Sequence, residues 1–201
     1  MKYIVLALTA VLAVSSFAAA RQSSTAAPST QQQQPAPKPP LDLSAQVPAS
    51  KPDDVKSIDS ILAALYNVIS GPAGERDWNR FRSLFLPSAT LTSAGKDREG
   101  NIRLRPRSVD EYVKSSGDYF SQHGFFESPI VNRIQTFGNI AHVSSSYESR
   151  NTLGEAPVAR GINSIQLAYD GQRWWIVSIL WDQERPDNPL PKEFATRPAT
   201  P

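Results

Sequence analysis

The feature that most constrains the fold is the segment GINSIQLAYDGQRWWIVSILW, which spans residues 161–181. Apolar and polar residues alternate on both sides of the Asp-Gly dipeptide at 170–171, which favours a two-residue turn between antiparallel strands. The preceding segment, residues 125–150, alternates in the same way around the Gly-Asn dipeptide at 138–139. We therefore expect four long antiparallel strands in this half of the chain, arranged as two hairpins.

Three helices are expected before these strands. Residues 53–70 repeat apolar side chains at spacings of three and four, and a Gly-Pro pair follows them. Residues 77–87 carry an apolar stripe between an N-capping aspartate and a proline that is expected to stop the helix. Residues 108–123 begin with the Ser and Glu of a capping box. A short hairpin is expected within 88–107, and helices segregated from an antiparallel sheet predict an α+β domain.

Both faces of the last hairpin contain large apolar side chains. Alternation outward from the turn places Asn163, Ser178 and Asp182 on the face that the helices are expected to cover. The opposite face then carries Trp175, Val177, Ile179 and Trp181. A large apolar patch left over in this way marks an interface, so we predict a homodimer through that face. The alternative is that a terminal segment or a loop covers it.

The two ends of the chain differ in composition from the predicted domain, residues 53–186. Residues 1–20 have the short positive start, apolar run and small-residue end of a secretory signal peptide. We predict cleavage after Ala20, export to the periplasm or the extracellular space, and no stable membrane insertion afterwards. An uncleaved anchor is the alternative, but it needs a longer apolar run. Residues 21–52 predict a disordered Pro/Gln-rich tether, and residues 187–201 a Pro-rich tail.

Composition narrows the classes of function. The 201 residues include no cysteine and carry a formal net charge of +2. The lack of cysteine excludes disulfides, thiolate metal sites and a lipid-anchored cysteine. No His, Asp or Glu cluster has metal-ligand spacing, and no phosphate loop, dinucleotide fingerprint or nucleophile elbow is present, so neither a metal nor a cofactor is expected. The basic stretch at 103–107 is local, and nucleic-acid binding is not expected.

Two motifs carry a family resemblance. The pattern D-W-x-x-F-x-x-L-F begins at Asp77, and the pattern D-G-x-R-W-W-I-V begins at Asp170. Together with the order of elements over residues 53–185, they resemble the nuclear transport factor 2-like superfamily, and within it the SnoaL-like branch of small bacterial proteins. The resemblance implies a cone-shaped, cystatin-like fold in which a strongly bent antiparallel sheet wraps around three helices and leaves an apolar pocket. Members include ketosteroid isomerases, dehydratases, epoxide hydrolases, polyketide cyclases and binding domains without chemistry, so the resemblance implies no single reaction.

The cone geometry implies which side chains line the pocket. The expected ligand-binding residues are Tyr66, Trp78, Phe81, Phe85, Tyr112, Tyr147, Asn163 and Ser178. Two of the residues expected on the concave face are candidates for catalysis: Asp182 as a general base and Tyr147 as a donor that polarises a carbonyl. The alternatives are a rim carboxylate in water and a core tyrosine with a satisfied hydroxyl. No matched catalytic pair of the isomerase, epoxide-hydrolase or dehydratase kind can be placed.

The sequence leaves three functions open. We favour an exported SnoaL-like domain that binds a small apolar molecule in the cone pocket as a homodimer, without catalysis. The second is a cofactor-free lyase, isomerase or cyclase that uses acid–base residues in the pocket. The third is a protein-association module that acts through the sheet face. The sequence does not identify the ligand.

Overall fold

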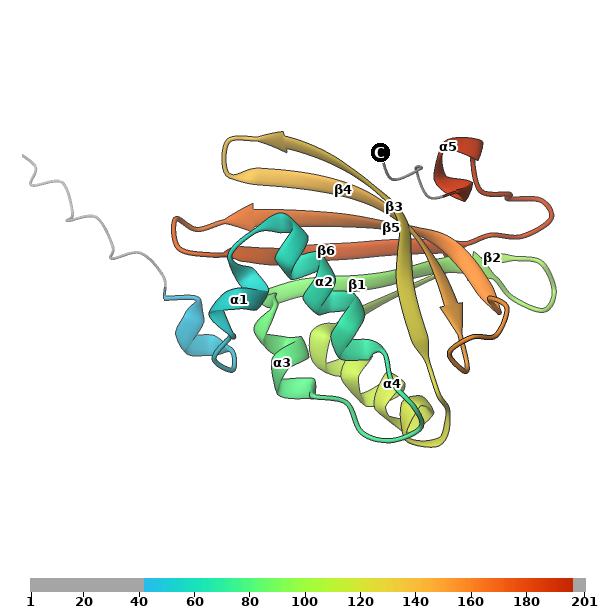
Figure 1. Ribbon diagram of the computed structural model, residues 1–201, viewed down its shortest axis with the longest axis horizontal. Helices are drawn as coiled ribbons and strands as arrows, with labels where there is room; N and C mark the ends of the chain where they lie inside the picture. The colour runs from blue at the N-terminus through green and yellow to red at the C-terminus, as the bar shows by residue number, and fades with distance from the viewer. Residues whose placement is uncertain (1–41, 197–201) are drawn as a thin grey trace, which may run out of the picture. The chain divides into compact units, whose positions relative to one another are not determined.

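The computed structural model describes residues 42–196, which form an α+β unit (Figure 1). In chain order its elements are η1 (Ser44–Gln46), α1 (Pro52–Val55), α2 (Ile58–Ile69), α3 (Trp78–Ser83), β1 (Phe85–Lys96), β2 (Ile102–Ser108), α4 (Val109–Gln122), β3 (Phe126–Phe137), β4 (Ile140–Arg150), β5 (Ala159–Tyr169), β6 (Trp174–Gln183) and α5 (Lys192–Ala195). The strands form a six-stranded sheet in the order β2-β1-β6-β5-β4-β3. β1 and β6 run parallel, and the other neighbours are antiparallel. The predicted α+β class is confirmed.

The predicted terminal segments are described only in part. The signal peptide at 1–20 lies outside the described residues, as do residues 21–41 of the predicted tether and residues 197–201 of the tail. No helix within 42–196 is long and apolar enough to cross a membrane.

The segment that follows the predicted domain packs against the sheet. The guanidinium of Arg133 on β3 lies 5.0 Å from the ring centroid of Phe194 in α5. Arg160 on β5 donates a hydrogen bond to the carbonyl oxygen of Ala195 at 3.0 Å. The first part of the Pro-rich tail therefore contacts the sheet, beyond the predicted domain end.

Local capping interactions explain where the helices begin. The Ser57 hydroxyl accepts a hydrogen bond from the amide of Ser60, and this cap divides the expected first helix into α1 and α2. The Asp77 carboxylate caps α3 through the amide of Arg80 at 2.9 Å, as predicted. The predicted capping box at the start of α4 is present.

The second helix ends earlier than the sequence predicts. α3 stops at Ser83, and Pro87 lies within β1 instead of ending the helix. The pairing of β1 with β6 is irregular between Phe85 and Thr90, so the missing N–H of the proline interrupts no regular part of that ladder. The hairpin predicted within residues 88–107 is confirmed by the antiparallel pairing of β1 and β2.

The predicted C-terminal hairpins are both present, but the turn between β5 and β6 is longer than predicted. Tyr169 pairs with Trp174, so the loop contains four residues, not two. The Asp170 carboxylate closes this loop by accepting hydrogen bonds from the amides of Gln172 and Arg173, each at 2.8 Å. Because the change in register is two residues, the faces next to the turn remain as predicted.

A β-bulge in β6 reverses the predicted faces from Ser178 onward. Gln166 pairs with Ser178 and Leu167 pairs with Ile176, so Val177 between them has no partner. The extra residue moves every later side chain to the other face. The prediction was therefore wrong for this part of the strand. Residues 179 and 181 point toward the helices, and residues 178 and 182 point away from them.

The helices α2, α3 and α4 gather on one side of the sheet (Figure 1). The core forms where their apolar faces meet that side. Its most deeply buried side chains are Ile61, Leu62, Phe81, Leu84, Phe85, Val143, Ile165, Leu167 and Ile176. A helix layer on one face of an antiparallel sheet buries that face.

The close contact at Gly161 on β5 provides a test of this packing. A Cβ atom at this position would overlap the carbonyl oxygen of Asp182 and lie 2.6 Å from the Tyr147 hydroxyl. We expect Gly161→Ala to lower the free energy of unfolding by about 1–3 kcal/mol, as measured by urea denaturation. Gly95→Ala on β1 is the control, because no atom lies within 4 Å of its added methyl group. Equal stability losses in the two variants would contradict the described packing.

Candidate functional site

A cavity of about 260 Å³ lies between the helices and the concave face of the sheet. Its apolar wall consists of Leu65, Ile69, Phe81, Leu91, Phe120, Phe125, Ile179 and Trp181. Six polar side chains that share this cavity are central to the site: Arg107, Tyr112, Glu127, Tyr147, Asn163 and Gln183. An apolar cavity with a few converging polar groups is the usual form of a small-molecule site.

A second bulge brings the acidic group to this cavity. Glu127 on β3 lies opposite Ser149 on β4, and both line the cavity. The β3–β4 register shifts between Pro129 and Val131, which leaves Ile130 without a partner. Glu127 therefore faces the helices, although the outer part of the same strand alternates in the opposite phase.

The environment of Glu127 favours its neutral form. Burial raises the pKa of the carboxyl to about 8, and a hydrogen bond from Asn163 opposes this only in part. The carboxyl is therefore mostly protonated at neutral pH. In that form it can donate a hydrogen bond, and above pH 8 it becomes a base.

A buried hydrogen-bond network fixes the amide that contacts Glu127. The Asn163 amide donates to the Tyr66 hydroxyl at 3.2 Å. The Tyr66 hydroxyl shares a hydrogen bond of 2.5 Å with Ser145, and Ser145 donates to Asn132 at 2.6 Å. Because the hydroxyls of Tyr66 and Ser145 have hydrogen-bond partners away from the cavity, the network holds Asn163 in one orientation toward the cavity.

Two tyrosine hydroxyls face the same space. Burial raises the pKa of Tyr112 to about 12 and also raises the pKa of Tyr147, and the nearby Glu127 carboxyl adds to both shifts. Both phenols are therefore neutral donors at physiological pH. Ser116 forms a hydrogen bond with Tyr112, whereas within residues 42–196 the Tyr147 hydroxyl has no such partner. Tyr147 is thus free to bind a ligand atom.

The structure brings together about half of the predicted ligand-binding residues. Phe81, Tyr112, Tyr147 and Asn163 line the cavity. The other four predicted residues lie behind the cavity wall or outside the cavity: Tyr66, Trp78, Phe85 and Ser178. Of the latter, Ser178 is displaced by the bulge in β6, and the other three contribute to the core around the cavity.

Asp182, the predicted general base, lies on the other face of the sheet. Arg185 donates to its carboxylate at 3.0 Å, and this hydrogen bond holds the pKa of Asp182 below its usual value. A carboxylate paired in this way remains ionised and is a weak base. Its position and its partner therefore describe a structural ion pair and not a proton acceptor in the cavity.

The residues predicted to form the dimer face lie on both faces of the sheet. Ile179 and Trp181 line the cavity, because they follow the bulge. Trp175 lies before it and is 1% exposed. Its indole N–H donates to Asp170 at 2.6 Å, and the Arg173 guanidinium lies 3.7 Å from its ring centroid. Contacts within this chain thus cover Trp175, and the homodimer itself remains a prediction.

Neither Glu127 nor the role of Arg107 was predicted from the sequence. The signal for Glu127 was an isolated carboxylate inside the apolar stretch FFESPIV at residues 125–131. Such a residue is rarely buried without a reason. The face on which Glu127 lies depends on a bulge, however, which simple alternation does not reveal.

Among residues 42–196, no three His, Asp or Glu side chains cluster closely enough to hold a metal ion.

Comparison with solved structures identifies the fold. The chain is similar to a cystatin-like protein of unknown function from Nostoc punctiforme, with 11% identity over 64% of this chain and 90% of that chain and a TM-score of 0.50. It is also similar to the beta subunit of a candidate aromatic-ring-hydroxylating dioxygenase from Novosphingobium aromaticivorans, with 13% identity over 65% and 88% of the two chains and a TM-score of 0.50. No family model matches the sequence, and no curated protein does.

A further match is a candidate ketosteroid isomerase from Parabacteroides distasonis, at 11% identity over 65% of this chain and 91% of that chain, with a TM-score of 0.44. The chain has a cystatin-like fold, as the resemblance implied. Identities at this level show the fold alone, and the SnoaL-like branch remains a prediction.

The raised pKa of Glu127 predicts a pH dependence of stability. Because the pKa is higher in the folded state, the stabilisation is fully present below the unfolded value of about 4.3 and is lost as the pH rises through 8. Glu127→Gln cannot ionise. Relative to the wild type, it should gain roughly 3–5 kcal/mol of unfolding free energy between pH 4 and pH 9 in urea titrations.

The control for this comparison is Glu155→Gln, which alters an exposed carboxyl. Its stability relative to the wild type should remain nearly constant over the same pH range. Parallel pH curves for the wild type and Glu127→Gln would show that Glu127 is not held in an apolar environment.

Proposed function

We propose that this domain binds a small molecule with a mostly apolar or aromatic body, and that Glu127, Tyr147 and Asn163 hold its polar group. The observation that carries the proposal is the neutral carboxyl of Glu127, which faces an apolar cavity beside a tyrosine hydroxyl that lacks a partner within the described chain. Buried polar groups normally have partners, so incomplete pairing at a cavity indicates a ligand position. The volume, about 260 Å³, suits a molecule of one or two rings.

A second candidate function is proton transfer to or from such a ligand. It is favoured by the Glu127 pKa of about 8, since a general base works best with a pKa near the working pH. In this reaction the Glu127 carboxylate removes a proton from a carbon next to a carbonyl group. The Tyr147 hydroxyl then stabilises the oxygen on which negative charge develops.

Two further proposals rest on the sequence. We propose that the mature chain is exported after cleavage at residue 20, and that it forms a homodimer. Native mass spectrometry of the protein from its own secretory compartment tests both proposals, since it measures the mass of the N-terminally processed chain and the number of chains per particle. An unprocessed monomer would contradict both.

Ligand binding is tested with a fragment library of one- and two-ring aromatic compounds, screened by ligand-observed NMR. We expect several compounds to bind the wild-type protein and to lose binding in Ser116→Phe, because residue 116 lines the cavity and a phenyl ring there fills it. Ser121→Phe is the control, since Ser121 lies on the same helix, is exposed and does not line the cavity. A library with no binders, or binders insensitive to Ser116→Phe, would overturn the proposal.

Proton transfer is tested in heavy water with those bound compounds that carry a hydrogen next to a carbonyl. If Glu127 is a base, the protein should accelerate deuterium incorporation at that carbon, and the rate should rise with pH up to about 8. Glu127→Gln should abolish the acceleration, and Glu155→Gln should retain it. If the wild-type protein binds these compounds without any deuterium exchange, the binding function stands and proton transfer is excluded for those compounds.

A further inference from the structure

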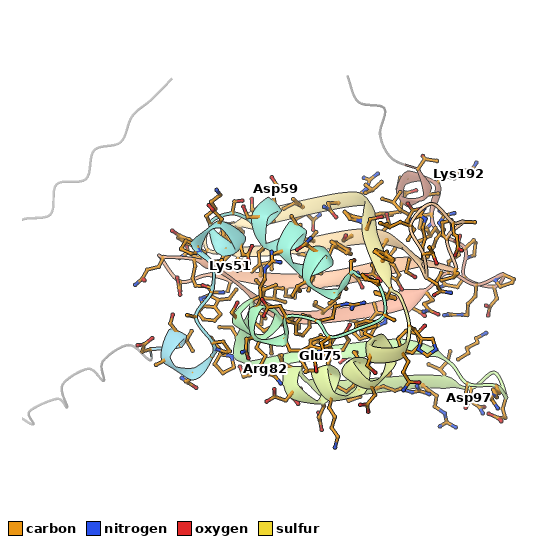
Figure 2. The ribbon with its side chains drawn as sticks, turned by 60° about the horizontal axis from the view of Figure 1, so that its bottom comes forward. Lys51, Asp59, Glu75, Arg82, Asp97 and Lys192 are labelled. Carbon is orange, nitrogen blue, oxygen red and sulfur yellow. The ribbon has the colours of Figure 1, made fainter. Side chains whose placement is uncertain are left out.

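A second groove, of about 300 Å³, adjoins the cavity along the β1–β2 hairpin. Its lining includes four basic side chains: Lys96, Arg103, Arg105 and Arg107. Arg107, Trp181 and Gln183 line both the groove and the cavity. The Arg107 guanidinium therefore stands at the boundary between an apolar interior and a basic exterior. Figure 2 shows Asp97 at the tip of this hairpin.

The alternation of β2 explains why the basic residues gather. Arg103, Arg105 and Arg107 lie two positions apart in an extended strand, so their side chains share one face. On β1, Gly95 pairs with Arg103 and Ser93 pairs with Arg105. Because these partners are small, the space between the arginines and β6 stays open as the groove.

Two of the four cations already have acidic partners. Arg103 forms an ion pair with Asp97 at 2.8 Å, and Lys96 forms one with Asp187. Within residues 42–196, Arg105 and Arg107 form no ion pair. Arg107, the positive charge nearest the cavity, is therefore one of the two that lack a counter-charge at contact distance.

Arg107 is held in place but incompletely paired. Its terminal nitrogens donate long hydrogen bonds to Ser115 at 3.2 Å and Ser93 at 3.5 Å, and its Nε–H is buried without a partner. The guanidinium carbon lies 5.5 Å from the ring centroids of both Tyr112 and Trp181. These rings hold the guanidinium at the mouth of the cavity without neutralising it.

The acidic groups near Arg107 do not satisfy it. Glu111 is close enough for Arg107 to help lower its pKa, but its carboxylate is bound to the amide and hydroxyl of Ser108 in the capping box. Glu127 lines the same cavity and is mostly protonated at neutral pH, so it does not repel an anion there. The interior therefore accepts an apolar body, and the mouth favours negative charge.

We infer that the ligand is a small aromatic or aliphatic carboxylate. Its apolar body fills the cavity, with any inner polar group at Glu127, Tyr147 and Asn163, and its carboxylate binds Arg107 at the mouth. This inference rests on the proposed ligand-binding function and names the chemical class of the ligand. A planar guanidinium with an unpaired Nε–H matches a carboxylate, which accepts two parallel hydrogen bonds. Arg105, further along the groove, adds positive charge on the outer side.

The test uses two probes of nearly the same shape, 2-naphthoate and its neutral analogue 2-naphthamide, titrated calorimetrically into the full chain at pH 7. We expect the wild type to bind 2-naphthoate roughly tenfold or more tightly than 2-naphthamide, as a charge-assisted hydrogen bond provides. Arg107→Gln should lose this preference, because its affinity for 2-naphthoate falls much further than its affinity for 2-naphthamide. Retained binding of 2-naphthamide shows that the cavity of the variant is intact.

Arg98→Gln is the matched control, because it removes the same charge from the exposed turn of the hairpin. It should retain the preference for the carboxylate. If the wild type binds both probes equally, or prefers the amide, or if Arg107→Gln keeps the preference, the inference is overturned while the binding function stands. If neither probe binds, both the inference and the binding function fail.

Discussion

The β-bulge at Val177 is the local feature on which the composition of the site depends. It reverses the alternation of β6, so that Ile179 and Trp181 turn toward the helices. In an unbroken strand, Ser178 and Asp182 would face the helices, and the indole of Trp181 would lie on the other face. A bulge leaves one residue unpaired and preserves the ladder on either side. One extra residue therefore decides which side chains form the cavity wall.

The cavity is polar only where a buried network supports it. Asn163 connects Glu127 to the hydroxyls of Tyr66 and Ser145. Asn163, Tyr66 and Ser145 are buried. Burying such groups is tolerated because each has a partner. The carboxyl at the end of the network is the exception, since its burial is compensated only in part, and its pKa rises accordingly. Groups perturbed in this way cluster at functional sites.

The site separates two kinds of polarity. A carboxyl that is mostly neutral lies inside the cavity, and an unneutralised guanidinium lies at its mouth between Tyr112 and Trp181. The same indole contributes to the cavity wall and to the frame of Arg107. The bulge in β6 thus connects both halves of the site, because it turns this indole toward the helices.

The sequence by itself determined the α+β class, the hairpins and the helix starts at Asp77 and Ser108. Those features depend on contacts between residues close in the chain, such as caps and turns, which leave a local pattern. It did not determine the faces of β3 and β6 beyond the bulges at Ile130 and Val177, and therefore not the position of Glu127 in the cavity. Only the tertiary structure decided these faces and this position. A bulge is defined by the pairing of a strand with its neighbour, and a carboxyl is buried by helices that are distant in the sequence.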